Sequence, residues 1–230
     1  MNPKTTSKYW MRACRSPKFP EMPMHVFALG HYRNLEAGKE EFSMKMNGFY
    51  LHGYSKEYFL GLLLDMWKMH FQNDAIKWDV ITVYPTRDKG RFNENMVWLA
   101  TELSKRTGVP YRQILERNRP IKPSHELANV DERYDNVKDS VDVTEDVTGK
   151  NVLIMDNAST SGLSLLAAKH KLLSMGASHV AGICLGLGEL GKDTDYDINP
   201  AKKASEMMTI FKSPKVSKEK REAWKKQQGR

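Results

Sequence analysis

An acid, an amide and a run of small hydroxyl residues follow one apolar segment of the chain. The segment Val152 to Ser164 reads VLIMDNASTSGLS, so Asp156 and Asn157 come directly after an apolar run. If that run is a buried strand and a helix begins after Gly162, unpaired backbone N–H groups, small hydroxyls and the positive end of a helix dipole converge on one point. Such a point favours an anion.

A monophosphate suits this loop better than a triphosphate. The pattern GxxxxGK[ST] is absent, so no lysine is placed to reach β- and γ-phosphates. Gly162 is expected to let a phosphate approach the backbone closely, and the Asp156 carboxylate suits vicinal hydroxyls, which can donate two hydrogen bonds to it. A strand ending in Asp before a Ser/Thr/Gly loop also occurs in many other α/β proteins, so the loop alone does not decide the matter.

Strands that alternate with helices are expected to hold this loop in place. The apolar runs 79–85, 151–156 and 179–188 are typical of buried strands, and helices are expected over 91–108, with Gly108 as its cap, and over 162–175. This order predicts right-handed βαβ units, and therefore an α/β fold with a parallel sheet flanked by helices. Such sheets bind ligands at the carboxyl ends of their strands.

The N-terminal half is expected to add a small β-containing element. Residues 25–32 read as a strand, and Asn47-Gly48 is a dipeptide preferred in tight hairpins. Ser55 is a candidate cap for a core-covering helix over 55–71. Further on, two short strands are expected, within 111–117 and 139–150.

The charge of the chain is concentrated at its C-terminal end. Of a net charge of +8 over 230 residues, 212–230 contribute eight Lys or Arg and two Glu, a net +6. We expect a basic, extended or poorly ordered arm over 1–22, one domain over 23–210 and a basic tail over 211–230. The tail reads either as a solvated end or as a contact for nucleic acid.

Two composition features limit the function classes. No segment approaches the roughly 20 apolar residues of a membrane helix, and residues 1–15 lack the apolar run of a secretory signal, so we expect a cytoplasmic protein without a membrane partner. Cys14 and Cys184 form no CxxC pair, which argues against a zinc ribbon or a disulfide framework. No metal site built by the protein alone is expected, and a homodimer is left open.

The order of strand, acid and hydroxyl loop resembles the phosphoribosyl pyrophosphate motif of type I phosphoribosyltransferases. That motif consists of a hydrophobic strand, two acids, a hydrophobic residue and the sequence xTTGxT. Asp156 matches the first acid, Asn157 replaces the second, and Ala158 matches the hydrophobic position. The resemblance assigns Asp156 and Asn157 to the catalytic positions. It assigns the 5-phosphate to the loop Ser159, Thr160, Ser161, Gly162, Leu163 and Ser164.

Upstream segments are similar to the ComF-like (competence protein F-like) subgroup, and the likeness covers roughly 78–188. VYPTRDKGRFNENMVWLA matches a strand that ends in proline and is followed by basic residues, FN and a helix, although Arg91 stands where the family has glycine. The cysteine-rich zinc module common in ComF proteins is absent. The resemblance implies that one loop faces the pyrophosphate: Thr86, Arg87, Asp88, Lys89 and Gly90.

The segment 117–141 resembles the basic, mobile segment of the same family. Its R-x-x-N-V element is matched by Arg133, Asn136 and Val137. The basic residues Arg117, Arg119, Lys122 and Arg133 fit either a solvated loop or a flexible lid over a polyanion.

Two functions follow from the resemblance. One is a transferase in which phosphoribosyl pyrophosphate with Mg²⁺ reacts with a nitrogen nucleophile, or a relative that binds a nucleoside 5-phosphate. Arg87, Lys89 and Lys122 would then hold the departing pyrophosphate. The other is a non-catalytic ComF-like protein in DNA uptake or nucleic-acid handling, with the fold used as a ligand sensor. The exchange of an acid for Asn157 and the basic tail favour this second function.

Overall fold

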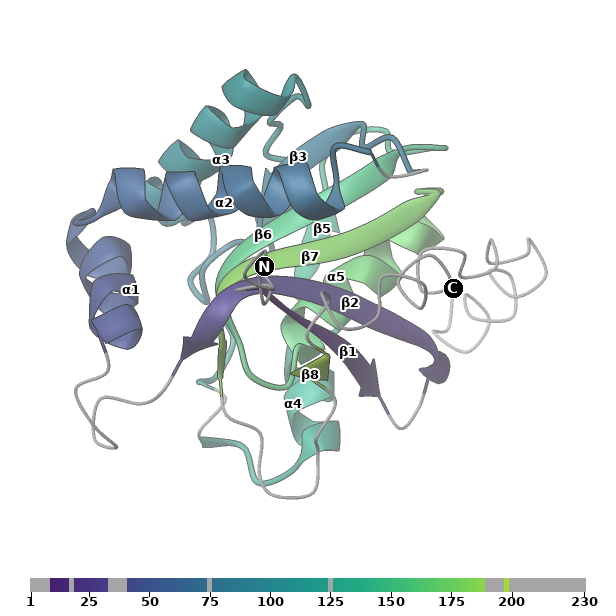
Figure 1. The fold of residues 1–230 in the computed structure, drawn as a ribbon. Helices are drawn as coiled ribbons and strands as arrows, with labels where there is room; N and C mark the ends of the chain where they lie inside the picture. The colour runs from purple at the N-terminus through teal and green to yellow at the C-terminus, as the bar shows by residue number, and fades with distance from the viewer. Residues whose placement is uncertain are drawn as a thin grey trace.

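A sheet of six strands forms the centre of the protein in a computed structural model that describes residues 9–16, 19–32, 41–73, 76–123, 126–188 and 197–198. The strand order is β3-β6-β7-β2-β1-β8. Four neighbouring strands are parallel: β3 (Val80–Val83), β6 (Asn151–Ser159), β7 (His179–Gly188) and β2 (Phe19–Tyr32). Two strands at one edge are antiparallel to their neighbours: β1 (Trp10–Ser16) and β8 (Asp197–Ile198). Figure 1 shows the twisted sheet with helices in front of it and behind it.

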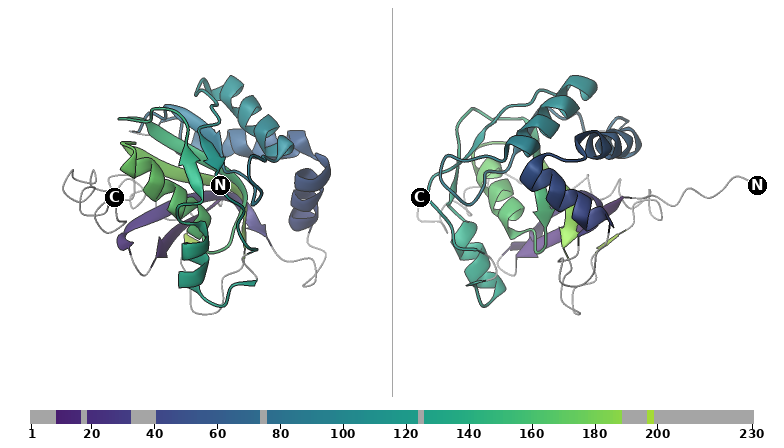
Figure 2. Two further views of the ribbon diagram at one scale, coloured as in Figure 1. Left: turned by 180° about the vertical axis from the view of Figure 1, so that it is seen from behind. Right: turned by 90° about the vertical axis from the view of Figure 1, so that its left-hand side faces the viewer.

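Helices cover both faces of the sheet (Figure 2). One face is covered by α1 (Glu41–His52), α2 (Lys56–His70) and α3 (Glu94–Thr107). The other face carries α4 (Val130–Val137), α5 (Leu163–Ser174) and the small antiparallel sheet of β4 (Leu115–Arg117) and β5 (Val141–Val143).

Alternate residues of β6 pack into two separate cores. Leu153 and Met155 belong to the core under α1–α3, whereas Val152 and Ile154 belong to the core under α5. All four side chains are fully buried, as expected for a central strand of a parallel sheet. The predicted α/β fold with a mainly parallel sheet flanked by helices is therefore confirmed.

The two helices expected after the strands are also confirmed, and local signals explain their ends. Asn93 Oδ1 accepts a hydrogen bond from Met96 N (3.0 Å) at the start of α3, and Gly108 ends it with a φ of 78°. The second helix, α5, starts after Gly162 and packs against β1, β7, β5 and β2. In the chain, α3 is the next helix after β3, and α5 is the next helix after β6.

The N-terminal region differs from the sequence-based expectation. Residues 10–16, expected in an arm, form β1, because pairing with β2 buries the side chains of Met11 and Cys14. The hairpin expected at Asn47-Gly48 is wrong: both residues lie within α1, whose Ser43, Met46 and Phe49 are buried at helical spacing. The packing of that face outweighs the turn preference of the dipeptide.

Several smaller expectations can be compared with the structure. Ser55 precedes α2 with a φ of 59° and makes no side-chain capping bond, so its predicted role as a cap is wrong. The short strands within 111–117 and 139–150 are present as β4 and β5. Cys14 and Cys184 are buried free thiols. The described helices are all too short or too polar to span a membrane. Residues 1–8 and the tail over 211–230 lie outside the described residues.

Candidate functional site

Asp156 lies inside β6, three residues before the strand ends. Asn157 N donates a hydrogen bond to its Oδ1 at 2.8 Å. Burial raises the pKa of the Asp156 carboxyl to about 7, although this hydrogen bond and the positive charge of Arg117 act in the opposite direction. At neutral pH, therefore, the carboxyl exchanges between a form that only accepts hydrogen bonds and a form that can also donate one.

The loop after β6 and the first turn of α5 form a pocket of about 320 Å³, which we call the α5 pocket. Ser159 is 4% exposed and lines it, yet its Oγ has no hydrogen-bond partner among the described residues. No side-chain cap covers the N-terminus of α5. The residues that line the α5 pocket are Arg133, Asp156, Ala158, Ser159, Thr160, Ser161, Gly162, Leu163, Ser164 and Leu165.

A buried arginine from β1, three strands away from β6 in the sheet, holds the loop of the α5 pocket. Arg12 on β1 is 2% exposed and donates to the carbonyl oxygens of Ser159 (3.2 Å), Thr160 and Gly188 (2.9 Å). In a trans peptide the N–H points opposite to the C=O. The N–H groups of Thr160 and Ser161 therefore point away from Arg12.

Gly162 has a packing role in addition to the role expected of it. It has a φ of 69°, and a Cβ at this position would overlap Cys14 Sγ and Cβ. The missing side chain thus lets α5 start against β1. Gly162 also lines the α5 pocket, and its expected close approach to a phosphate stays a prediction.

A second pocket, of about 160 Å³, lies at the end of β3, and we call it the β3 pocket. Asp156 lines both pockets, so the two pockets share this residue. Tyr50 from α1 and Asn93 from the start of α3 reach it together, and Asn93 Nδ2 donates to Tyr50 O at 2.9 Å. The β3 pocket is lined by Tyr50, Tyr84, Pro85, Thr86, Arg87, Asn93, Met96, Arg117, Ile121, Asp156 and Asn157.

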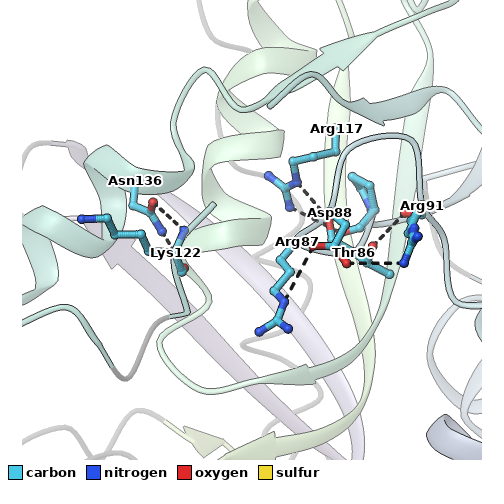
Figure 3. A network of polar contacts seen from close by, with 8 residues as sticks. Thr86, Arg87, Asp88, Arg91, Arg117, Lys122 and Asn136 are labelled. Carbon is cyan, nitrogen blue, oxygen red and sulfur yellow. Dashed lines mark hydrogen bonds and ion pairs between the residues drawn. The ribbon is translucent and has the colours of Figure 1, made fainter. Parts of the chain in front are cut away.

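The loop Thr86 to Gly90 is closed on itself and supported from below by Arg117. Thr86 N and Oγ1 both donate to Arg91 O at 3.0 Å. Figure 3 shows Arg117 reaching this loop. It is 1% exposed and donates to Thr86 O (3.0 Å), Pro85 O (3.3 Å) and Ser140 Oγ. Arg117 was expected in a solvated loop or a lid, and both expectations are wrong because backbone carbonyls fix its guanidinium in the core.

We call the loop Thr86 to Gly90 the β3 loop. Its basic side chains, and that of Arg91 directly after it, are exposed. Arg87 is 64% exposed, and its Nε lies 3.9 Å from Asp88 Oδ1. Arg91 NH1 lies 4.0 Å from the same carboxylate (Figure 3). Ion pairs of this length on the surface hold a side chain weakly. Arg87 lines the β3 pocket, whereas Asp88, Lys89 and Gly90 are exposed and do not line it.

The predicted mobile segment contains a helix and is tied to the β3 loop. Asn136 on α4 exchanges two hydrogen bonds with the backbone of Lys122 (3.1 and 3.0 Å), and Ile121 N donates to Arg87 O at 3.2 Å. Arg119 donates to Asn136 O at 3.1 Å. Arg119 and Lys122 line neither pocket, but Arg133 lines the α5 pocket.

Sequence reasoning missed the residues that arrive from distant parts of the chain. Arg12, Tyr50, Tyr84 and Asn93 were not among the candidates. For Asn93 a signal existed, since it is a residue type preferred at helix starts and occurs in the FN pair. Arg12 lies in a segment whose burial depends on pairing with β2, which no local pattern reveals.

The part of the chain that the structure describes offers few ligands to a metal ion. Within the described residues, His, Cys, Asp and Glu nowhere gather in groups of three or more. Asp156 supplies one carboxylate to the two pockets, and Mg²⁺ is commonly held by one or two carboxylates together with substrate phosphates. Mg²⁺ therefore fits this site when phosphate oxygens of a ligand complete its coordination.

Comparisons with known proteins find similarity in three dimensions alone. No family model and no curated protein matches the chain. Among solved structures, the chain is similar to a purine phosphoribosyltransferase from Pyrococcus horikoshii (17% identity, 60% of this chain, 77% of that chain, TM-score 0.39). A hypoxanthine phosphoribosyltransferase from Staphylococcus aureus is similar at 15% identity, over 62% of this chain and 72% of that chain, with a TM-score of 0.39.

A glutamine phosphoribosylpyrophosphate amidotransferase from B. subtilis is 25% identical over 56% of this chain, with a TM-score of 0.34. The chain spans only 26% of the length of that enzyme. Each of these structures aligns with about 56–62% of this chain, at TM-scores of 0.34 to 0.39.

Proposed function

We propose that the chain is a phosphoribosyltransferase-like protein that binds phosphoribosyl pyrophosphate or a nucleoside 5-phosphate. One observation carries this proposal: Asp156, which is half-buried, lines both the α5 pocket and the β3 pocket. A ribose that bears a phosphate on one side and a second group on the other has its hydroxyls between the two. The arrangement of the pockets matches such a ligand.

Each part of the ligand has candidate partners. The 5-phosphate would lie in the α5 pocket, where N–H groups of the loop, Ser159 Oγ and the N-terminus of α5 favour an anion. Asp156 would accept hydrogen bonds from the ribose hydroxyls. The pyrophosphate would lie on the β3 side, near Arg87 and, on the exposed part of that loop, Lys89.

Transfer would consist of one displacement at the anomeric carbon. The lone pair of a nitrogen nucleophile forms the new C–N bond as the C–O bond to pyrophosphate breaks, and pyrophosphate departs with the bonding electrons. The proton lost by the nitrogen passes to water. The residues of this chain would contribute by positioning the ribose and stabilising charge. Mg²⁺, when bound with the ligand, would neutralise charge on the pyrophosphate.

The same proposal includes the family and the subgroup to which the chain belongs. Membership of the type I family is supported by the order of motif elements around Asp156, and the ComF-like subgroup by the loop 86–90 and the R-x-x-N-V element at Arg133. The acceptor of the phosphoribosyl group is left unassigned. The expected cytoplasmic location and a homodimer stay predictions.

Calorimetric titration of the full chain with phosphoribosyl pyrophosphate and Mg²⁺ tests the proposal. We expect saturable binding that Asp156→Ala weakens strongly and Asp142→Ala leaves unchanged, because Asp142 is an exposed carboxylate on β5 that lines neither pocket. Absence of binding at millimolar ligand would refute the proposal.

A second candidate, a non-catalytic ligand sensor, is favoured by Asn157. An amide in place of the second acid leaves a single carboxylate at the junction of the pockets. A screen for pyrophosphate release over a set of nucleobases separates the two candidates, since the sensor binds the ligand without turnover. If Asn157→Asp then produces turnover, the missing acid is the cause.

The nucleic-acid role of the ComF-like alternative rests on the tail over 211–230. In the full chain, replacing the eight Lys and Arg of 212–230 with Gln should reduce the salt dependence of single-stranded DNA binding if the tail neutralises phosphates. Equal, negligible binding before and after the replacement would count against this role.

A further inference from the structure

Arg133 on α4 reaches the α5 pocket with an unused hydrogen-bond donor. Its NH2 group donates to Leu127 O at 3.3 Å, while its buried Nε has no hydrogen-bond partner among the described residues. The side chain lines the pocket together with the loop that follows β6. A buried guanidinium N–H without a partner is costly, so its presence in a polar pocket indicates a ligand that accepts its hydrogen bond.

Two other sets of donors meet Arg133 in the same pocket. Ser159 is 4% exposed, and its Oγ finds no partner in the described part of the chain. The first turn of α5 contributes N–H groups that no side chain caps. The donors come from three elements, α4, β6 and α5, and they all suit one anionic group with several acceptor oxygens.

We propose that Arg133 binds the 5-phosphate of the ligand in the α5 pocket. The pocket would then select a phosphomonoester over the corresponding alcohol. The proposal rests on the proposed function of this pocket and specifies the charge that its ligand carries. A guanidinium presents a planar fork of donors that matches two phosphate oxygens. This role differs from the expectation that Arg133 belongs, with Arg119 and Lys122, to one mobile loop.

The position of α4 gives the proposal a second consequence. Tyr134 Oη lies 2.8 Å from His170 Nδ1, which connects α4 to α5. Burial lowers the pKa of His170 to about 4, so the imidazole is neutral and shares this hydrogen bond with the hydroxyl. A phosphate held between Arg133 and the start of α5 would connect the same two helices at another point. Ligand binding should therefore protect the amides of α4 from hydrogen exchange.

The test compares ribose 5-phosphate with ribose on four forms of the full chain: wild type, Arg133→Gln, Arg133→Lys and Arg106→Gln. Arg106 is an exposed arginine in the last turn of α3 and lines neither pocket, so it is the matched control for loss of one positive charge. We expect Arg133→Gln to weaken ribose 5-phosphate binding by about 10- to 100-fold. Arg133→Lys should lose less, and Arg106→Gln nothing.

Each outcome is decisive. If wild type binds ribose 5-phosphate and Arg133→Gln binds it equally well, the role of Arg133 is wrong, while the proposed function stands. If wild type fails to bind both ribose 5-phosphate and phosphoribosyl pyrophosphate, both are wrong. Should Arg133→Gln not fold by circular dichroism, the charge-retaining Arg133→Lys decides through its affinity relative to wild type.

Hydrogen exchange supplies a readout that a purely structural role would not change. Ribose 5-phosphate should increase protection of the amides of 130–137 in wild type and in Arg106→Gln. The increase should disappear in folded Arg133→Gln at the same fractional occupancy. Equal protection in the two variants would overturn the proposed link between the phosphate and α4.

Discussion

The α5 pocket and the β3 pocket are supported in the same way but lined by different chemistry. A buried arginine lies beneath the loop of each: Arg12 under the loop after β6, and Arg117 under the loop after β3. Both donate to backbone carbonyl oxygens and both are at most 2% exposed. The α5 pocket presents small hydroxyl residues and uncapped N–H groups, whereas the β3 pocket presents two tyrosines, two amides and an outward arginine.

This difference separates the residues that hold the site from those that select its ligand. The buried arginines use their donors on the protein itself and should therefore affect stability first. The lining residues with unused donors, such as Ser159 and Arg133, should affect binding first. Substitutions that lower stability and substitutions that lower affinity should therefore fall on different residues.

Removing a supporting arginine should have the largest effect. For Arg12→Met and Arg117→Met we expect the free energy of unfolding to fall by about 2–4 kcal/mol, because several buried carbonyl groups lose their donor. Urea unfolding measures this free energy, and Arg106→Met, at an exposed arginine, is the control. A loss below about 1 kcal/mol in both variants would mean that the carbonyl groups find other hydrogen-bond donors. The two buried arginines would then not be the common support of the two pockets.

Replacing the shared carboxyl should change how stability depends on pH. The folded chain holds the Asp156 proton up to a pH of about 7, whereas an unfolded Asp ionises near pH 4. Wild type therefore loses stability from this group as the pH rises from 4 to 7. Asp156→Asn should equal wild type near pH 4 and exceed it at pH 8 by more than about 1 kcal/mol.

The control for this pH effect is Asp142→Asn, whose exposed carboxylate should leave the pH profile unchanged. Thermal unfolding from pH 4 to 8 gives the curves. Parallel curves for wild type and Asp156→Asn would show that the Asp156 pKa is not raised.

The same ionisation should strengthen ribose binding between pH 6 and 8, because the carboxylate accepts hydrogen bonds from hydroxyls better than the carboxylic acid does.

Ser159→Ala should separate binding from stability in the α5 pocket. The variant removes a buried hydroxyl that has no partner in the described chain, so we expect the free energy of unfolding to stay the same or rise slightly. Affinity for ribose 5-phosphate should fall by about 3- to 10-fold, the effect of one neutral hydrogen bond. Loss of stability without loss of affinity would show that Ser159 supports the loop and does not bind the ligand.

Arg87→Gln should have the smallest effect on stability. Its 3.9 Å contact with Asp88 is exposed, so the free energy of unfolding should change by less than about 0.5 kcal/mol. If the β3 pocket receives the pyrophosphate, affinity should fall more for phosphoribosyl pyrophosphate than for ribose 5-phosphate. Equal losses for the two ligands would contradict the division between the pockets.

Local sequence patterns were sufficient for the strand and the helix on either side of the loop after β6. The apolar run before Asp156 predicted β6, and the Ser/Thr/Gly run after it predicted the start of α5, because burial on both faces and helix starts leave signals within a few residues. The pairing of Asp156 with hydroxyl residues in one pocket followed from the same run.

Contacts between distant residues were beyond such patterns. Arg12 and Ser159 are 147 positions apart, and nothing near Arg12 indicates that its guanidinium ends beside a loop. Arg117 and Arg133 belong to a segment whose composition is typical of a solvated loop. Yet Arg117 is buried under the β3 loop, and Arg133 lines the α5 pocket. At Asn47-Gly48, burial of Phe49 outweighed a turn preference. In each case tertiary packing decided the outcome.

A competition experiment tests most directly whether the two pockets form one ligand site joined at Asp156. Calorimetric titration of the full chain with phosphoribosyl pyrophosphate and Mg²⁺ should give one ligand per chain. Ribose 5-phosphate and pyrophosphate should each weaken that binding, and each should still bind in the presence of the other. Phosphoribosyl pyrophosphate binding that saturating ribose 5-phosphate leaves unchanged would contradict the account.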